Sequence, residues 1–243
     1  MPSLETLAVV LALCAALTLI SYRLRLLTRS GSVASFLMGA IIGLFGSVNW
    51  LLLLIAFALI GFLVTRFKLE LKIKKGVQEG RQGERTYKNV LANGLVPAIV
   101  VVVSFASGNE NSILAGIVYI ASLSEAASDT IASELGVLSS KVRLITNFSK
   151  VEVGTDGGVS LYGTFWALMA AIFASIIGWL VVLPNVPLDV RVLVPIAFGF
   201  MGCFLDSLIG ATLERGGKIS KLGNNILSMA FAAIGSYALL LAI

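Results

Sequence analysis

The chain has 243 residues, of which 58% are hydrophobic and only 13% are charged. Soluble globular domains carry about 25% charged residues, so this composition predicts an integral membrane protein and excludes an ordinary soluble enzyme. The formal net charge of +5 does not indicate nucleic-acid binding, because the basic residues collect in alternate loops. The sequence contains no histidine, which excludes the commonest general base and the commonest zinc ligand.

Apolar segments recur along the whole chain at lengths that suit membrane spans, which need about 20 residues. We therefore expect an all-α polytopic membrane helix bundle of about eight transmembrane helices, forming a single domain over residues 1–243. The predicted spans cover residues 4–22, 33–48, 49–65, 90–106, 112–130, 161–183, 192–213 and 225–243. The second span is short and glycine-rich, which suits close packing or a re-entrant path. The alternating pattern of residues 141–153 predicts a small hairpin.

The positions of the basic residues predict the orientation. Cytoplasmic loops of membrane proteins carry an excess of Lys and Arg. Here 17 of the 18 Lys and Arg residues fall in alternate loops, and the opposite loops hold only Arg191. We therefore expect a multi-pass protein with both termini outside. Its active face is then cytoplasmic, with loops at about residues 66–88, 134–160 and 214–224.

Apart from Glu5 at the very start of the first span, three acidic residues lie inside predicted spans, where each charge costs about 2.5–3.5 kcal/mol and needs a reason. Glu125 and Asp129 are four residues apart and share a helix face, and Asp206 has a similar depth in the seventh span. Carboxylates at the ends of two helices are able to hold one Mg²⁺ ion together with substrate phosphates. We predict metal ligands at Glu125, Asp129 and Asp206, with Asp129 and Asp206 catalytic. The alternative is that each acid pairs with a loop cation.

A glycine-rich loop, Gly154 to Ser160, precedes the sixth predicted span. Backbone amides freed by glycine, next to a helix N-terminus, form an anion site, although a flexible turn is the alternative. We expect Val at Gly157 or Gly158 to weaken phosphate binding more than it lowers thermal stability. The predicted substrate- and nucleotide-binding residues are Arg85, Asn93, Ser133, Glu134, Lys141, Gly154, Thr155, Gly157, Gly158 and Ser160. Alternatively, the cations among them are topology signals and Asn93 bonds between helices.

Four segments together resemble the integral membrane family that includes plant phytyl-phosphate kinase and animal transmembrane protein 19. The segments are Asn89-Val90-Leu91-Ala92-Asn93-Gly94, Asp129 to Gly136, Gly154 to Thr164, and Asp206 to Ala211. Their order and the number of helices match, so the resemblance covers nearly the whole chain. The sequence departs from the expected pattern at Asn89 and Glu214, where we expect Gln.

The resemblance implies an isoprenoid-phosphate kinase. Such an enzyme moves a phosphoryl group from a nucleoside triphosphate, with CTP the implied donor, to a prenyl monophosphate such as phytyl or geranylgeranyl phosphate. Its partners are the nucleotide, Mg²⁺, a lipid phosphate within the bilayer and membrane lipids. The residues agree with this, since an already anionic monophosphate needs no general base and the chain has no histidine.

Two rival functions fit the same residues. A membrane transporter would also use intramembrane acids and a short second span, although transporter sites usually lie at the membrane midplane. A lipid cytidylyltransferase would use the same metal and phosphate groups but would release pyrophosphate. The products therefore distinguish these reactions.

Overall fold

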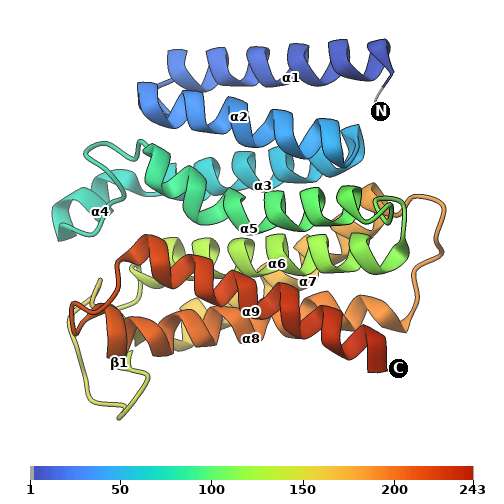
Figure 1. Ribbon diagram of the computed structural model, residues 1–243. Helices are drawn as coiled ribbons and strands as arrows, with labels where there is room; N and C mark the ends of the chain where they lie inside the picture. The colour runs from blue at the N-terminus through green and yellow to red at the C-terminus, as the bar shows by residue number, and fades with distance from the viewer. Residues whose placement is uncertain (1–2, 243) are drawn as a thin grey trace.

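The structure is a computed structural model that describes residues 3–242 as a bundle of α-helices with one small pair of strands (Figure 1). The α-helices are α1 (Leu4–Arg23), α2 (Arg29–Phe45), α3 (Val48–Arg66), α4 (Leu69–Lys75), α5 (Tyr87–Ala106), α6 (Ile113–Gly136), α7 (Leu161–Val182), α8 (Leu193–Ile209) and α9 (Lys221–Ala242). The 3-10 helix η1 (Val190–Val192) precedes α8, and the π-helical turn η2 (Gly210–Glu214) continues it.

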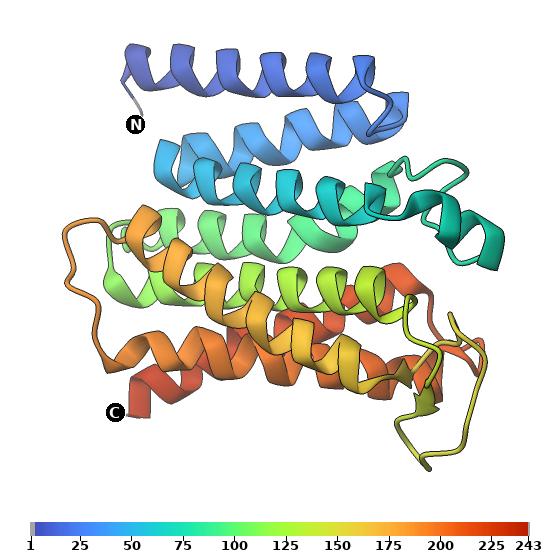
Figure 2. The same cartoon turned by 180° about the vertical axis from the view of Figure 1, so that it is seen from behind.

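The prediction of a polytopic all-α membrane bundle is confirmed, but the number of spans is not. Within residues 3–242, six helices are long and apolar enough to cross a membrane, instead of about eight, namely α1, α3, α5, α7, α8 with its flanking turns, and α9. The two helices that fall short are both present and lie alongside the others (Figures 1 and 2). Helix α2 has only 17 residues, and the serines and carboxylates of α6 lower its hydropathy.

Helix α6 is the centre of the bundle and packs against α3, α5, α7, α8 and α9. All of its side chains from Ala115 to Ser128 are buried. The hydroxyl groups in this stretch donate to backbone carbonyls or to another hydroxyl, which makes their burial tolerable, whereas one carboxylate oxygen of Glu125 is buried without a hydrogen-bond partner. The Tyr119 hydroxyl donates to the Trp50 carbonyl at 2.7 Å, and the Ser128 hydroxyl donates to the Ala167 carbonyl at 2.7 Å.

Glycines on α8 allow it to lie directly on α6. A side chain at Gly199 would overlap Ser124, and one at Gly202 would overlap the side chain of Glu125. Small residues at a helix–helix contact permit this close approach within a membrane. Asp206 lies four residues after Gly202, so it shares the face of α8 that meets α6.

The two ends of the bundle differ. Helix α1 begins and helix α9 ends at one end, together with the α7–α8 connector that carries Arg191 (Figure 1). The opposite end carries α4, the strands and the α8–α9 loop. This distribution agrees with the charge split seen in the sequence.

The loops at that second end have more structure than the sequence predicts. Residues 66–88 neither extend α3 nor remain a plain loop, because α3 ends at Arg66 and α4 follows as a separate short helix. The hairpin predicted in residues 141–153 is present, with the Val151 amide donating to the Val142 carbonyl at 3.2 Å. A strand absent from the prediction joins it, as β1 (Arg143–Leu144) pairs antiparallel with β2 (Gly158–Val159).

Candidate functional site

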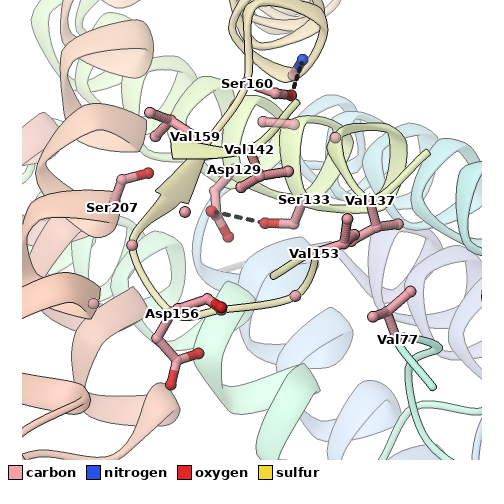
Figure 3. A pocket seen from close by; sticks show the side chains of 18 of the residues that line it. Val77, Asp129, Ser133, Val137, Val142, Val153, Asp156, Val159, Ser160 and Ser207 are labelled. Atoms are coloured by element: carbon pink, nitrogen blue, oxygen red, sulfur yellow. Dashed lines mark hydrogen bonds between the residues drawn. The ribbon is translucent and has the colours of Figure 1, made fainter. Parts of the chain in front are cut away.

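A cavity of about 550 Å³ lies at the end of the bundle that carries α4 and the strands. Its walls are the last turns of α6, the start of α7, the end of α8 and the loop that leads to β2. Figure 3 shows Asp129 pointing into the middle of this cavity, with Ser207 of α8 on one side and Asp156 of the loop below it. Residues distant in the sequence therefore meet here.

Both predicted catalytic acids line the cavity. The Ser133 hydroxyl donates to Asp129 at 3.4 Å, and the Ser228 hydroxyl donates to Asp206 at 3.5 Å. The side-chain amide of Asn224 donates to the Asp206 backbone carbonyl at 3.0 Å, which fixes this part of α8. Because both carboxylates line the same cavity, their negative charges repel each other. A cation between them would relieve that repulsion.

The glycine-rich loop forms one wall of the cavity, but its glycines are needed mainly for the backbone conformation of the loop. Gly154 and Gly157 have φ angles of +88° and +73°, which favour glycine. A side chain at Gly157 would also overlap the backbone of Ala211. The Gly158 amide donates to the Thr155 carbonyl at 2.8 Å, so part of the expected amide cradle is used within the loop. The Ser160 hydroxyl accepts from the Gly163 amide at 3.1 Å and caps α7.

The structure brings together most, but not all, of the predicted site residues. The predicted residues that line the cavity are Asp129, Ser133, Glu134, Gly154, Thr155, Gly157, Gly158, Ser160 and Asp206. Four others lie elsewhere. Lys141 is exposed outside the cavity, and Glu125 is buried between α6 and α8. Asn93 is buried on α5, where its amide donates to the Asn89 carbonyl at 2.9 Å, and Arg85 is buried before α5.

A cluster that the sequence analysis missed supplies one of the cavity's cations. Lys221, at the start of α9, lies 3.5 Å from a carboxylate oxygen of Glu79, and both residues line the cavity. Burial alone would raise the pKa of Glu79, but Lys221, the amide of Asn89 and Arg85 outweigh it and lower that pKa. No local sequence pattern connects Lys221 with Glu79, because they lie 142 positions apart in the chain.

Lys72 and Glu134 form a buried ion pair that attaches α4 to the end of α6. The Lys72 ammonium lies 2.6 Å from Glu134, and it also donates to the carbonyls of Val64 and Thr65 at 2.9 and 3.3 Å. The Thr65 hydroxyl donates to Glu134 at 2.8 Å and accepts from Arg85 at 3.2 Å. Arg85, predicted to bind phosphate, therefore braces this network. Burial lowers the pKa of Arg85, although the negative charges of Glu134, Glu79 and Asp129 partly offset this effect.

The charge of the cavity limits what it can bind. Its walls carry seven carboxylates, on Glu79, Asp129, Glu134, Glu152, Asp156, Asp206 and Glu214, but only two ammonium groups, on Lys75 and Lys221. A polyphosphate would be repelled unless cations accompany it. Carboxylate oxygens are suitable ligands for a hard cation such as Mg²⁺. Among residues 3–242, however, no group of three or more His, Cys, Asp or Glu side chains is placed to hold a metal ion.

The carboxylates of the cavity fit Mg²⁺ only as an ion that the protein shares with the substrate phosphates. Mg²⁺ usually binds through one or two carboxylates, with substrate phosphates and water completing its coordination. Asp129 of α6 and Asp206 of α8 both line the cavity and provide two such carboxylates. Glu125, predicted as a third ligand, does not line the cavity with them.

Comparison with known proteins gives relatives along nearly the entire chain. The chain is 37% identical over 230 residues to the uncharacterized membrane protein MJ0933 of Methanocaldococcus jannaschii, covering 94% of this chain and 92% of the relative. It is 28% identical to Protein VTE6, chloroplastic, of Arabidopsis thaliana, covering 88% of this chain and 65% of the relative. It is 29% identical to Protein PGR of the same plant, covering 82% and 76%.

No solved structure gives a significant match. A family model, described as "Integral membrane protein DUF92", matches residues 12–234. This match includes all of α2 to α8 and every residue that lines the cavity. The family resemblance seen in the sequence is thereby confirmed, and the chain belongs to the integral membrane protein family DUF92.

Proposed function

We propose that this protein is a membrane-embedded kinase that transfers the γ-phosphoryl group of a nucleoside triphosphate to a prenyl monophosphate. The observation that carries the proposal is the cavity in which Asp129, Asp206 and the Gly154–Ser160 loop meet at one end of a membrane bundle. The family resemblance implies the same reaction class, with CTP as the donor.

The reaction requires little from the protein beyond positioning and charge neutralisation. An oxygen of the lipid monophosphate attacks the γ-phosphorus, the bond from that phosphorus to the β–γ bridging oxygen breaks, and the nucleoside diphosphate leaves. The attacking oxygen is already anionic, so no side chain has to remove a proton. The absence of histidine is therefore compatible with the reaction, and cations have to accompany the phosphates into the carboxylate-rich cavity.

The cavity residues take distinct roles under this proposal. Asp129 and Asp206 would hold Mg²⁺, which when bound neutralises charge on the phosphates. Lys221 contributes a further positive charge to the cavity, and its contact with Glu79 keeps it there. The Gly154–Ser160 loop closes one side, so the phosphates would lie between this loop and the end of α8.

The cavity also has a place for an apolar tail. Its wall continues along α7 through Thr164 and Ala167 and along α8 through Cys203 and Phe204. These residues lie on helices that are long and apolar enough to cross a membrane. A prenyl chain leaving between α7 and α8 would remain in the bilayer while its phosphate occupies the cavity. This arrangement supports a lipid acceptor over a soluble one.

The test is a product analysis of the purified protein in nanodiscs with Mg²⁺ and geranylgeranyl monophosphate. CTP or ATP labelled in the γ-phosphate should transfer its label to a prenyl diphosphate, and CTP labelled in the α-phosphate should not. Lipid labelled from the α-phosphate, with release of pyrophosphate, would instead identify a cytidylyltransferase. The absence of labelled lipid with either donor, accompanied by flux of a solute across the membrane, would identify a transporter.

A further inference from the structure

A second cavity, of about 920 Å³, lies at the same end of the bundle and shares no lining residue with the first. It is formed by the α1–α2 connector, the ends of α1 and α3, helix α4 and the loop that precedes α5. We call it the arginine hollow. The residues that line it are Tyr22, Arg23, Leu24, Arg25, Leu27, Arg66, Leu69, Ile73, Arg81, Gln82 and Glu84.

The hollow is strongly basic, in contrast to the acidic cavity. Four arginines line it, and Glu84 is its only acid. The Glu84 carboxylate accepts hydrogen bonds from the backbone amides of Arg81 and Gln82, at 3.2 and 2.6 Å. Each oxygen of this carboxylate thus accepts one hydrogen bond from the loop backbone, and no arginine of the hollow forms a salt bridge with it among the described residues. The side chains of Arg23, Arg25 and Arg81 form no hydrogen bond within the described part of the chain, so they remain available to an anion from outside.

The hollow has a defined shape and is not a random collection of loop charges. The Arg66 guanidinium donates to the carbonyls of Leu24 and Arg25 at 3.3 and 3.1 Å, which ties α3 to the α1–α2 connector. The Arg85 amide donates to the Leu26 carbonyl at 2.9 Å, which ties the same connector to the loop before α5. Arg25 has a φ angle of +54°, a conformation that is rare outside glycine.

The rim of the hollow is apolar where a lipid would meet it. Leu24 is 59% exposed and Ile73 is 44% exposed, and both line the hollow. Leu24 follows directly after α1, and Arg66 is the last residue of α3, so these side chains lie at the ends of two membrane-spanning candidates. Exposed leucine and isoleucine beside arginine suit a ligand that has an anionic head and acyl chains. A soluble phosphate would not use this rim.

We infer that the arginine hollow binds the phosphate headgroup of an anionic phospholipid, whose acyl chains pass over Leu24 and Ile73. Guanidinium groups bind phosphate oxygens with two parallel hydrogen bonds, which favours arginine over lysine at such a site. Basic pockets between the helices of membrane proteins are suited to anionic headgroups. This site is separate from the acidic cavity, so the inference does not depend on the proposed kinase reaction.

The experiment compares lipid binding by the full-length protein and two charge-matched variants, with native mass spectrometry as the readout. Arg23→Gln/Arg25→Gln/Arg81→Gln removes three charges from the hollow but leaves Arg66 and its structural bonds in place. The control, Lys88→Gln/Arg215→Gln/Lys218→Gln, removes three exposed charges that line neither cavity. Phosphatidylglycerol and phosphatidylcholine are titrated into each protein, and inorganic phosphate is tested as a competitor.

The wild-type protein and the control should both bind phosphatidylglycerol about tenfold or more tightly than phosphatidylcholine, and the hollow variant should lose this preference. A hollow variant that binds phosphatidylglycerol as the control does would overturn the inference. Displacement of the lipid by millimolar inorganic phosphate would assign the hollow to a soluble anion and also overturn it. Should the triple variant fail to fold, Arg81→Gln alone, at an exposed loop residue, gives the same comparison with Lys218→Gln.

Discussion

The ion pair between Lys72 and Glu134 gives the sharpest prediction about stability, through the substitution Lys72→Met. The Lys72 side chain is fully buried and that of Glu134 is 10% exposed. Methionine keeps the length and apolar character of the stem but leaves the Glu134 carboxylate without its cation. It also removes the donor that serves the carbonyls of Val64 and Thr65.

Breaking a buried ion pair at one partner costs about 3–5 kcal/mol. Glu134 would keep its hydrogen bond from Thr65, so we expect a loss near the lower limit, about 3 kcal/mol. The double variant Lys72→Met/Glu134→Gln should be more stable than the sum of the single variants predicts, by about 1–3 kcal/mol, because the second change removes the stranded charge.

Equilibrium unfolding of the purified protein by SDS in mixed micelles measures these free energies. The matched control is Lys74→Met, the same substitution on the same helix at an exposed residue, which should change stability by less than about 0.5 kcal/mol. If Lys72→Met is as stable as Lys74→Met, the pair does not hold α4 in place and the reasoning is refuted.

Three further outcomes follow from the acidic cavity and its loop. Asp129→Asn and Asp206→Asn should each reduce the rate of the proposed transfer by about 100-fold or more without changing the fold. The effects of the two substitutions should be non-additive, and near-normal turnover in both variants would reject a shared ion. Gly157→Ala should lower the free energy of unfolding by more than about 1 kcal/mol, because the φ angle of +73° at Gly157 disfavours any other residue and the backbone of Ala211 leaves no room for a side chain. A melting temperature equal to that of the wild type would contradict this. The lowered pKa of Glu79 stabilises the fold above its unfolded pKa of about 4.3, and this stabilisation is lost as the pH falls through the lower folded value. The difference in melting temperature between wild type and Glu79→Gln should therefore be constant near neutral pH and should shrink below about pH 4.3. A difference that grows as the pH falls below that value would show that Lys221 does not act on Glu79.

The Gly157 prediction reverses what the sequence suggests about the loop. A glycine-rich stretch before a helix is typical of phosphate binding, so the sequence predicts that substitution harms binding before stability. The structure shows that the glycine is needed where the loop touches the segment after α8. That contact joins two parts of the chain that no local pattern connects.

Much of the helical arrangement was accessible from sequence because apolar runs and charge-rich loops are local signals. Asp129 and Asp206 were identified because a carboxylate in an apolar run is conspicuous. Lys221 and Glu79 were not identified, since each appears in a polar loop and only packing places them side by side. The number of spans was overestimated because α2 has only 17 residues and the serines and carboxylates of α6 lower its hydropathy.

The position of α6 has a consequence for how the protein enters the membrane. A helix that carries Glu125 and Asp129 bears two charges that each cost about 2.5–3.5 kcal/mol at the bilayer centre, so it gains little by inserting alone. Ser124 and Ser128 donate to carbonyls of α7, and Ser124 and Glu125 lie against glycines of α8; both helices are synthesised later in the chain. Stable insertion of α6 therefore has to wait for α7 and α8, so membrane integration and tertiary folding are one event for the helix that carries Asp129.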